Sequence, residues 1–196
     1  MMNCILASKS PRRKEILETM GLSFEVVVAD TDEESEERDP RRLVEILARR
    51  KGYAVRDALK REGRDLSDTL IIASDTIVAI DEEILGKPRD EADACRMLRL
   101  YAGRSHEVVS GICLIKGDVC AVSHEVTEVS FDEMDEATIA RYVSLAQPYD
   151  KAGAYAIQGI ASAWIKKIDG DYFNVVGLPV STLNYMFYYC TGEYLS

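Results

Sequence analysis

The chain has 196 residues, of which 47% are apolar and 30% are charged. That is enough apolar content for one full-sized core and too little for two. Because the charges are interspersed with apolar runs, the composition excludes long disorder and a fibrous repeat. Thirty-four acidic residues against 24 lysines and arginines leave a net charge of −10, so the chain repels polyanions and we expect no nucleic-acid partner. We predict one domain over residues 1–196.

The apolar segments do not suit a membrane. The longest, Leu70 to Leu85, is broken by Asp75 and by the acids at 81–83, well short of the roughly 18 clean residues of a membrane span. At the N-terminus, the apolar segment 4–7 is followed by basic residues, which is the wrong order for a secretory signal. We therefore expect no membrane partner and a cytoplasmic location.

The cysteines and histidines give no metal or redox signature. The five cysteines are widely spaced and include no Cys-x-x-Cys pair, so we expect free, mostly buried thiols. His106 and His124, the only histidines, each lie in an alternating stretch that is typical of a strand. A histidine-based triad or a His-rich metal site is therefore not expected.

Strand and helix signals alternate along the chain. A capping residue followed by proline opens helices at Ser10-Pro11 and Asp39-Pro40, and the continuously apolar run 69–80 is typical of a strand covered on both faces. Hairpin turns are expected at 116–118 and 169–171. The expected strands are 3–7, 23–29, 69–80, 105–115, 119–131, 163–168 and 172–176, and the expected helices are 11–20, 40–62, a 12-residue helix after Asp90, 135–147 and 179–190. We predict an α/β fold with a mixed sheet flanked by helices.

The junction between the first strand and first helix, Ser8-Lys9-Ser10-Pro11-Arg12-Arg13, brings hydroxyls and guanidinium groups to a helix start. Unpaired backbone N–H groups and the positive end of the helix dipole lie at the same place. A phosphate chain fits such a site. The alternative is a capped helix with two solvated arginines.

Asp75 is the most informative single residue, because a carboxylate inside an apolar run is costly unless it is paired, metal-bound or at an open strand end. Ligands also bind at strand ends in α/β sheets. The alternative is that Asp75 forms a salt bridge or caps a turn. Lys51 on an apolar helical stripe and Lys87 in Gly86-Lys87-Pro88 are further cations that can reach inward, although lysine stems commonly lie along apolar surface. The acids at 32–34 by themselves indicate a solvated loop.

Five ordered motifs resemble the Maf family of nucleoside triphosphate pyrophosphatases. They are Ser-x-Ser-Pro-Arg-Arg at 8–13, Ser-Asp-Thr-Ile-Val at 74–78, Gly-Lys-Pro at 86–88, Asp-Lys-Ala-Gly-Ala-Tyr-Ala-Ile-Gln-Gly at 150–159 and Asn-Val-Val-Gly-Leu-Pro at 174–179. The resemblance spans almost the whole chain. Ser74 and Lys9 depart from the family pattern, in which Ala or Gly often precedes the aspartate and Gly is frequent at the position of Lys9.

The resemblance implies an elongated sheet, two lobes with a central cleft and a fold related to the inosine-triphosphate pyrophosphatases. It implies hydrolysis of a nucleoside triphosphate to the monophosphate and pyrophosphate, with a divalent cation, Mg²⁺ or Mn²⁺, and a homodimer. It makes Asp75 the proton acceptor and ties substrate choice to Arg12, Thr76 and Gln158, in the pattern of the subfamily that favours dTTP and UTP. We expect substrate binding by these three and by Ser8, Ser10, Arg13, Lys51 and Lys87.

Glu33 and Asp75 are hard oxygen donors suited to the divalent cation, and the sequence leaves open whether Asp75 is base, ligand or both. Gln158 offers a donor and an acceptor that match N3–H and a carbonyl of uracil or thymine, provided that a neighbour fixes the amide. Two alternatives remain: a pyrophosphatase for modified nucleotides such as 7-methyl-GTP, and a nucleotide-binding regulator of septum formation without turnover.

Overall fold

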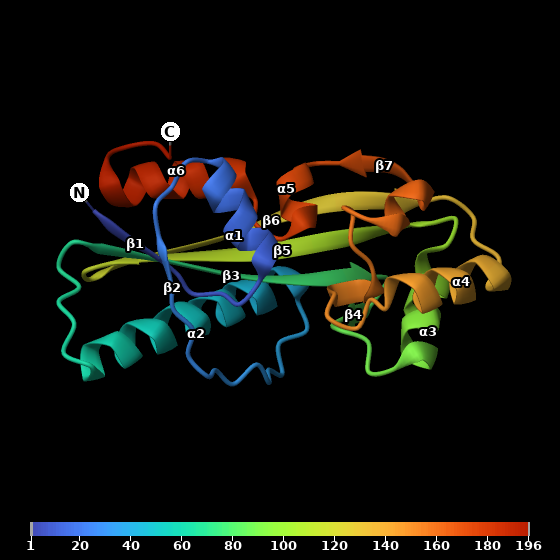
Figure 1. Ribbon diagram of the computed structural model, residues 1–196, viewed down its shortest axis with the longest axis horizontal. Helices are drawn as coiled ribbons and strands as arrows, with labels where there is room; N and C mark the ends of the chain where they lie inside the picture. The colour runs from blue at the N-terminus through green and yellow to red at the C-terminus, as the bar shows by residue number, and fades with distance from the viewer. Residues whose placement is uncertain (1, 196) are drawn as a thin grey trace.

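The computed structural model describes residues 2–195 and has a single mixed sheet with helices on both faces (Figure 1). The strands are β1 (Asn3–Leu6), β2 (Glu25–Val26), β3 (Thr69–Ile80), β4 (Glu83–Leu85), β5 (Ser105–Lys116), β6 (Val119–Phe131) and β7 (Ile165–Asp169). The helices are α1 (Pro11–Thr19), α2 (Pro40–Arg61), α3 (Glu91–Tyr101), α4 (Glu136–Ala146), α5 (Tyr172–Val176) and α6 (Val180–Thr191), with 3₁₀ turns η1 (Ala152–Ala154) and η2 (Ile160–Trp164). The α/β class and the mixed sheet are confirmed.

The sheet has the strand order β2-β1-β3-β5-β6-β7, with β4 paired to β3. β1 runs parallel to β2 and to β3, while the pairs from β3 through β5 and β6 to β7 are antiparallel. The long β5–β6 hairpin turns at 117–118, as the sequence predicts. The parallel side of the sheet therefore carries the first strand–helix junction, and the antiparallel side supplies a rigid support next to it.

β3 is apolar along nearly its whole length because both of its faces are covered. Ile71 and Ala73 pack with α2 on one face, whereas Leu70 and Ile72 pack with α1 and α6 on the other. Figure 1 shows α2 below the sheet and α1, α5 and α6 above it. A strand buried on both faces loses the alternation of an exposed strand, which explains its continuous apolar run.

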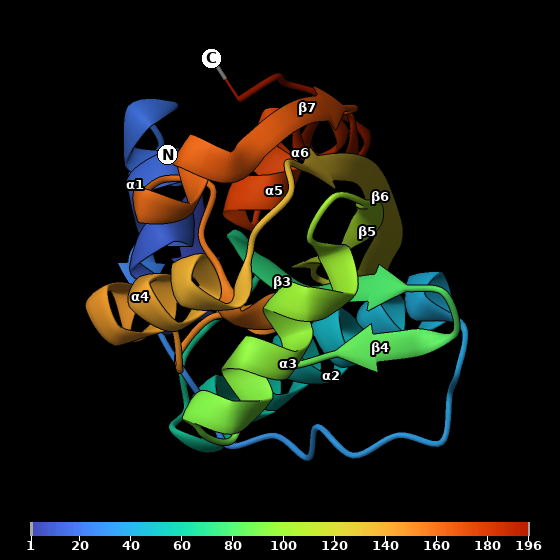
Figure 2. The ribbon, with the colours of Figure 1, turned by 90° about the vertical axis from the view of Figure 1, so that its right-hand side faces the viewer.

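A second core occupies the other end of the sheet. There Val78 and Val108 pack with apolar side chains of α3 and α4, and Figure 2 shows these two helices together at that end. Between the two cores, the β1 side of β3 lacks a strand neighbour. β1 pairs with β3 only as far as Ile72, and β4 begins to pair at Val78. This interruption in the sheet edge lies around Asp75.

Several sequence-based expectations are wrong in detail. The expected strand 23–29 is reduced to the two residues of β2, and the short β4 is missed. The expected strand 172–176 is the helix α5, because the Asp171 carboxylate accepts hydrogen bonds from the Phe173 and Asn174 backbone N–H groups and caps a helix instead of closing a hairpin. Ser10 occupies the N-cap position of α1, but its side chain makes no capping hydrogen bond.

The cysteine prediction is confirmed, because Cys4, Cys95, Cys113, Cys120 and Cys190 are all free thiols. Both histidines lie in strands, His106 in β5 and His124 in β6. Within residues 2–195, no helix is both long and apolar enough to span a bilayer.

Candidate active site

A cleft of about 680 Å³ opens at the interruption in the sheet edge and is lined by residues from both ends of the chain. All ten side chains that the sequence marks as site candidates line it: Ser8, Ser10, Arg12, Arg13, Glu33, Lys51, Asp75, Thr76, Lys87 and Gln158. They come from the β1–α1 junction, the acidic loop, α2, β3 and the loops after β4 and α4. The fold therefore brings together motifs that lie far apart in the sequence.

Arg13 is the buried cation of this cleft. It is 9% exposed, and its guanidinium donates to the Gly177 carbonyl at 2.8 Å, to Ser8 Oγ at 3.1 Å and to Thr76 Oγ1 at 2.9 Å. Burial lowers the pKa of Arg13, and the negative charge of Asp75 opposes that effect. Within residues 2–195 no carboxylate forms a salt bridge with Arg13, so a full positive charge is held by neutral groups beside the cleft.

The conformation of Gly177 explains one of these contacts. Its φ of 128° lies in the left-handed region that favours glycine. In that conformation its carbonyl accepts from Arg13 Nε at 2.8 Å and lies 3.3 Å from Thr76 Oγ1. The motif at 174–179 therefore contributes backbone to the cation site rather than a reactive side chain.

Two carboxylates contact the Lys51 ammonium group. Lys51 Nζ is 2.5 Å from Asp75 Oδ1 and 2.8 Å from Glu33 Oε1. Asp75 and Lys51 are largely buried, with side-chain exposures of 13% and 19%, whereas Glu33 is 63% exposed on the acidic loop. The hydrogen bond from Lys51 lowers the pKa of Glu33. Asp75 is thus both paired and at an open sheet edge, which resolves the cost of a carboxylate in an apolar strand.

Close packing of α2 against β5 makes the Lys51–Asp75 pair possible. Gly111 is the register partner of Asp75 on β5, and a Cβ added to it would lie 2.2 Å from the Val44 carbonyl oxygen of α2. The missing side chain lets the helix backbone approach the strand, and Lys51 follows two turns later on the same helix. The sequence alone does not single out Gly111, because a glycine inside a strand gives no sign of which backbone approaches it.

The remaining candidates surround the opening. Lys87 and Gln158 are exposed on the cleft wall, and Arg12 is half-buried there. The Gln158 amide makes no hydrogen bond within residues 2–195. A neighbouring residue that would fix the amide for recognition of uracil or thymine is therefore not found there. The Ser10 N–H donates to Ser8 Oγ at 3.2 Å, and the Ser10 side chain makes no capping hydrogen bond at the start of α1.

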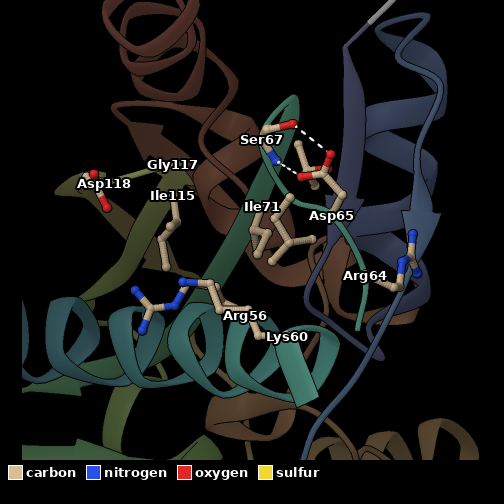
Figure 3. A pocket seen from close by; sticks show the side chains of 11 residues that line it. Arg56, Lys60, Arg64, Asp65, Ser67, Ile71, Ile115, Gly117 and Asp118 are labelled. Carbon is tan, nitrogen blue, oxygen red and sulfur yellow. Dashed lines mark hydrogen bonds between the residues drawn. The ribbon is translucent and has the colours of Figure 1, made fainter. Parts of the chain in front are cut away.

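A second cavity of about 340 Å³ lies near the start of β3 (Figure 3). Its charged side chains largely have partners on the protein: Arg64 is paired with Glu25 at 2.8 Å, Arg56 with Asp57 at 2.8 Å, and Asp65 accepts from Ser67. None of the ten candidates lines it. The larger cleft is therefore the candidate active site.

The cleft combines a buried guanidinium, a helix N-terminus, further cations and a carboxylate held at one oxygen. In a chain of net charge −10, this local accumulation of positive charge suits a polyanion such as a phosphate chain. The adjacent carboxylate can accept a proton from a nucleophile.

Comparison with known proteins identifies relatives of this chain. A dTTP/UTP pyrophosphatase of Symbiobacterium thermophilum is 47% identical over 92% of this chain and 90% of its own. A dTTP/UTP pyrophosphatase of Desulforamulus reducens is 48% identical over 91% of this chain and 92% of its own. Among solved structures, the Staphylococcus aureus Ham1 protein matches 66% of this chain and 71% of its own, with a TM-score of 0.46 and 14% identity. A family model described as Maf-like protein matches residues 3–189. The chain therefore belongs to the Maf-like protein family.

Proposed function

We propose that this chain hydrolyses nucleoside triphosphates, dTTP and UTP first among them, to the nucleoside monophosphate and pyrophosphate. The observation that carries the proposal is the buried Arg13, which has no carboxylate partner within residues 2–195 and faces the same cleft as Asp75. Relatives at 42–48% identity are named dTTP/UTP pyrophosphatases, which supports the choice of nucleotide.

Arg13 is arranged to bind phosphate oxygens. A guanidinium carries five N–H groups, and three of them are used by Ser8, Thr76 and Gly177. The two that remain, one on each terminal nitrogen, are available to phosphate oxygens. Lys87 and Arg12 add charge at the opening, and the N-terminus of α1 adds backbone donors. Together they hold the β- and γ-phosphates, which are the leaving group.

Asp75 is positioned to act as the base. Lys51 binds its Oδ1, which fixes the carboxylate and leaves Oδ2 to receive a proton. Water attacks the α-phosphorus, the bond from that phosphorus to the bridging oxygen breaks, and pyrophosphate leaves with the electron pair. The proton of the attacking water passes to Asp75 Oδ2. The interrupted sheet edge makes this oxygen accessible to water.

A divalent cation fits the donor set. Glu33 and Asp75 are hard oxygen donors that share one ammonium partner, Lys51, and no cluster of three ligating side chains occurs in residues 2–195. Two carboxylates completed by phosphate oxygens and water suit Mg²⁺ or Mn²⁺ bound together with a nucleotide. When bound, the cation would offset charge on the phosphates and polarise water.

A nucleotide-binding regulator without turnover is less well supported, because binding alone does not require a carboxylate fixed at one oxygen beside the phosphate site. The exposed Gln158 likewise gives no specific support for a modified guanine nucleotide.

The test is a panel of purified nucleoside triphosphates, including dTTP, UTP, CTP and 7-methyl-GTP, incubated with the protein and Mg²⁺ or Mn²⁺. Monophosphate and pyrophosphate are measured with and without added inorganic pyrophosphatase. We expect equal amounts of monophosphate and pyrophosphate, most rapidly from dTTP and UTP. Release of inorganic phosphate without pyrophosphate, or no turnover of any nucleotide, would contradict the proposal.

We also propose that the protein acts in the cytoplasm, where its substrates are made, and assembles as a homodimer through α6. No charged residue occurs from Tyr172 to Gly192, so two copies of net charge −10 can meet there with little repulsion. Tyr185 and Tyr189 are 68% and 76% exposed, and Tyr188 stacks on Tyr194. Tyrosine is enriched at interfaces, and these four exposed tyrosines supply roughly 500 Å² of the about 800 Å² per partner of a standard interface.

Sedimentation velocity tests this assembly. Tyr185→Lys is expected to shift the protein from dimer to monomer, whereas Leu145→Lys, at a residue that is 61% exposed on α4, is the matched control and keeps the dimer. A wild-type monomer at micromolar concentration would overturn the proposed assembly.

A further inference from the structure

Ser110 lies directly behind the cation site but outside the cleft. It is the register partner of Thr76 on the neighbouring strand, it is fully buried, and it is absent from the cleft lining. Its hydroxyl is 2.8 Å from Thr76 Oγ1 and 3.3 Å from the Asn174 carbonyl oxygen. Ser110 therefore cannot touch a ligand in the cleft, although it touches a residue that binds Arg13.

The chemistry of the donors sets the direction of these hydrogen bonds. A guanidinium can only donate, so Thr76 Oγ1 accepts from Arg13. A carbonyl can only accept, so satisfying the Asn174 carbonyl requires the Ser110 proton. Ser110 then accepts the single proton of Thr76 over 2.8 Å, a shorter contact than the 3.3 Å from Thr76 to the Gly177 carbonyl. The result is a one-way chain from Arg13 through Thr76 and Ser110 to the Asn174 carbonyl, in which each bond polarises the next.

The far end of this hydrogen-bond chain is buried and held by further hydrogen bonds. Asn174 is fully buried, and its side-chain amide donates to the Val108 carbonyl at 2.9 Å and to Thr127 Oγ1 at 3.0 Å. Three residues later, the Gly177 carbonyl accepts from Arg13 Nε. One short segment thus anchors the guanidinium twice, directly at Nε and through Ser110 and Thr76 at a terminal nitrogen.

We propose that Ser110 is a positioning residue for Arg13, which aims the two free N–H groups of the guanidinium at the phosphate chain. The proposal rests on the proposed function, in that the phosphate chain is what Arg13 binds. It also assigns the Thr76 hydroxyl to the support of Arg13, so that an effect of Thr76 on substrate choice acts through the guanidinium.

The test measures binding of inorganic pyrophosphate by isothermal titration calorimetry at fixed Mg²⁺, which needs no turnover. Ser110→Ala is expected to raise the Kd about fivefold, the effect of one hydrogen bond. Ser110→Ala added to Arg13→Ala is expected to have no further effect, because the group that it positions is gone. Ser105→Ala, which removes an exposed 2.8 Å hydroxyl pair at the far end of the same strand, is the control and leaves the Kd unchanged. Ser110→Cys keeps a polar group at this position, slightly larger and with a weaker hydrogen bond, and serves if the alanine variant unfolds.

The outcomes separate the two proposals. If the wild type binds no pyrophosphate, the phosphate site itself is wrong. If it binds and Ser110→Ala changes only the unfolding temperature, Ser110 is structural and the inference is overturned. Equal losses from Ser110→Ala with Arg13 present or absent also overturn it, because a positioning residue acts only through its target.

Discussion

The two carboxylate oxygens of Asp75 have different roles, because Lys51 binds Oδ1 while Oδ2 is assigned to the proton. Asp75→Asn keeps the size and removes both the charge and the basicity. We expect kcat to fall at least about 100-fold, as is typical for the loss of a general base.

Steady-state hydrolysis of dTTP and UTP measures this effect, and an unfolding curve confirms that the variant is folded. Asp30→Asn, which changes another carboxylate lining the same cleft, is the control and retains activity. Near-wild-type turnover by the Asp75 variant would remove this residue from the mechanism.

Selection of the base by Gln158 depends on a neighbour that fixes the orientation of its amide. Its amide is exposed and has no hydrogen-bond partner within residues 2–195, so it is free to turn and present either its donor or its acceptor to a base. Gln158→Ala should therefore lower kcat/KM for UTP and for CTP by a similar factor of about 5, the effect of one hydrogen bond. Competition assays with the two nucleotides check the ratio. A selective loss on UTP would show that bound substrate orders the amide.

The packing of helix α2 against strand β5 determines whether the Lys51–Asp75 pair can form. Gly111→Ala places a methyl group against the α2 backbone, which cannot yield as a side chain can. We expect a loss of about 1–3 kcal/mol in the free energy of unfolding, together with reduced kcat/KM because Lys51 moves away from Asp75.

Urea unfolding and steady-state kinetics measure these two effects. The matched control is Gly52→Ala on the same interface, where the added methyl meets the flexible end of Ile115 at 3.1 Å. Equal behaviour of the two variants would show that close approach at Gly111 is not required.

A buried aromatic cluster packs strand β5 against the loop before η2 and contributes to the stability of the whole molecule. His106 is 3% exposed, accepts or donates one hydrogen bond with Tyr155 at 2.7 Å, and packs against Tyr101 and Phe131. Burial lowers the pKa of His106 to about 3. The neutral imidazole is therefore the form that the folded protein accommodates.

This cluster predicts a pH dependence of stability. Between pH 6.5 and 3 the unfolded chain binds a proton at His106 and the folded protein does not, so this stability is present above about pH 6.5 and is lost as the pH falls towards 3. From pH 6.5 to 5, the loss is about 2 kcal/mol. Urea unfolding at both pH values should show a smaller loss for His106→Gln, which cannot titrate. Equal losses would mean that other groups account for the acid sensitivity.

Interactions between residues close in the sequence account for the positions of several helices and for the main features of β3. The capping signals at Asp39 and Asp90 and the periodicity of α2 place those helices because the required contacts are within a few residues. The apolar run of β3 indicates burial on both faces, and the anomalous Asp75 within it indicates a site. The motifs at 8–13, 74–78, 86–88, 150–159 and 174–179 indicate the family, since their order and spacing are properties of the chain itself.

Contacts between residues distant in the sequence are seen only in the tertiary structure. Whether 172–176 pairs as a strand depends on competition between a hairpin and the Asp171 cap. The approach of Gly111 to Val44, the support of Arg13 by Ser110, and the position of Lys51 between two carboxylates each join residues more than 20 positions apart or on different elements. The sequence does not encode such contacts in any local pattern, because they arise from the packing of whole elements.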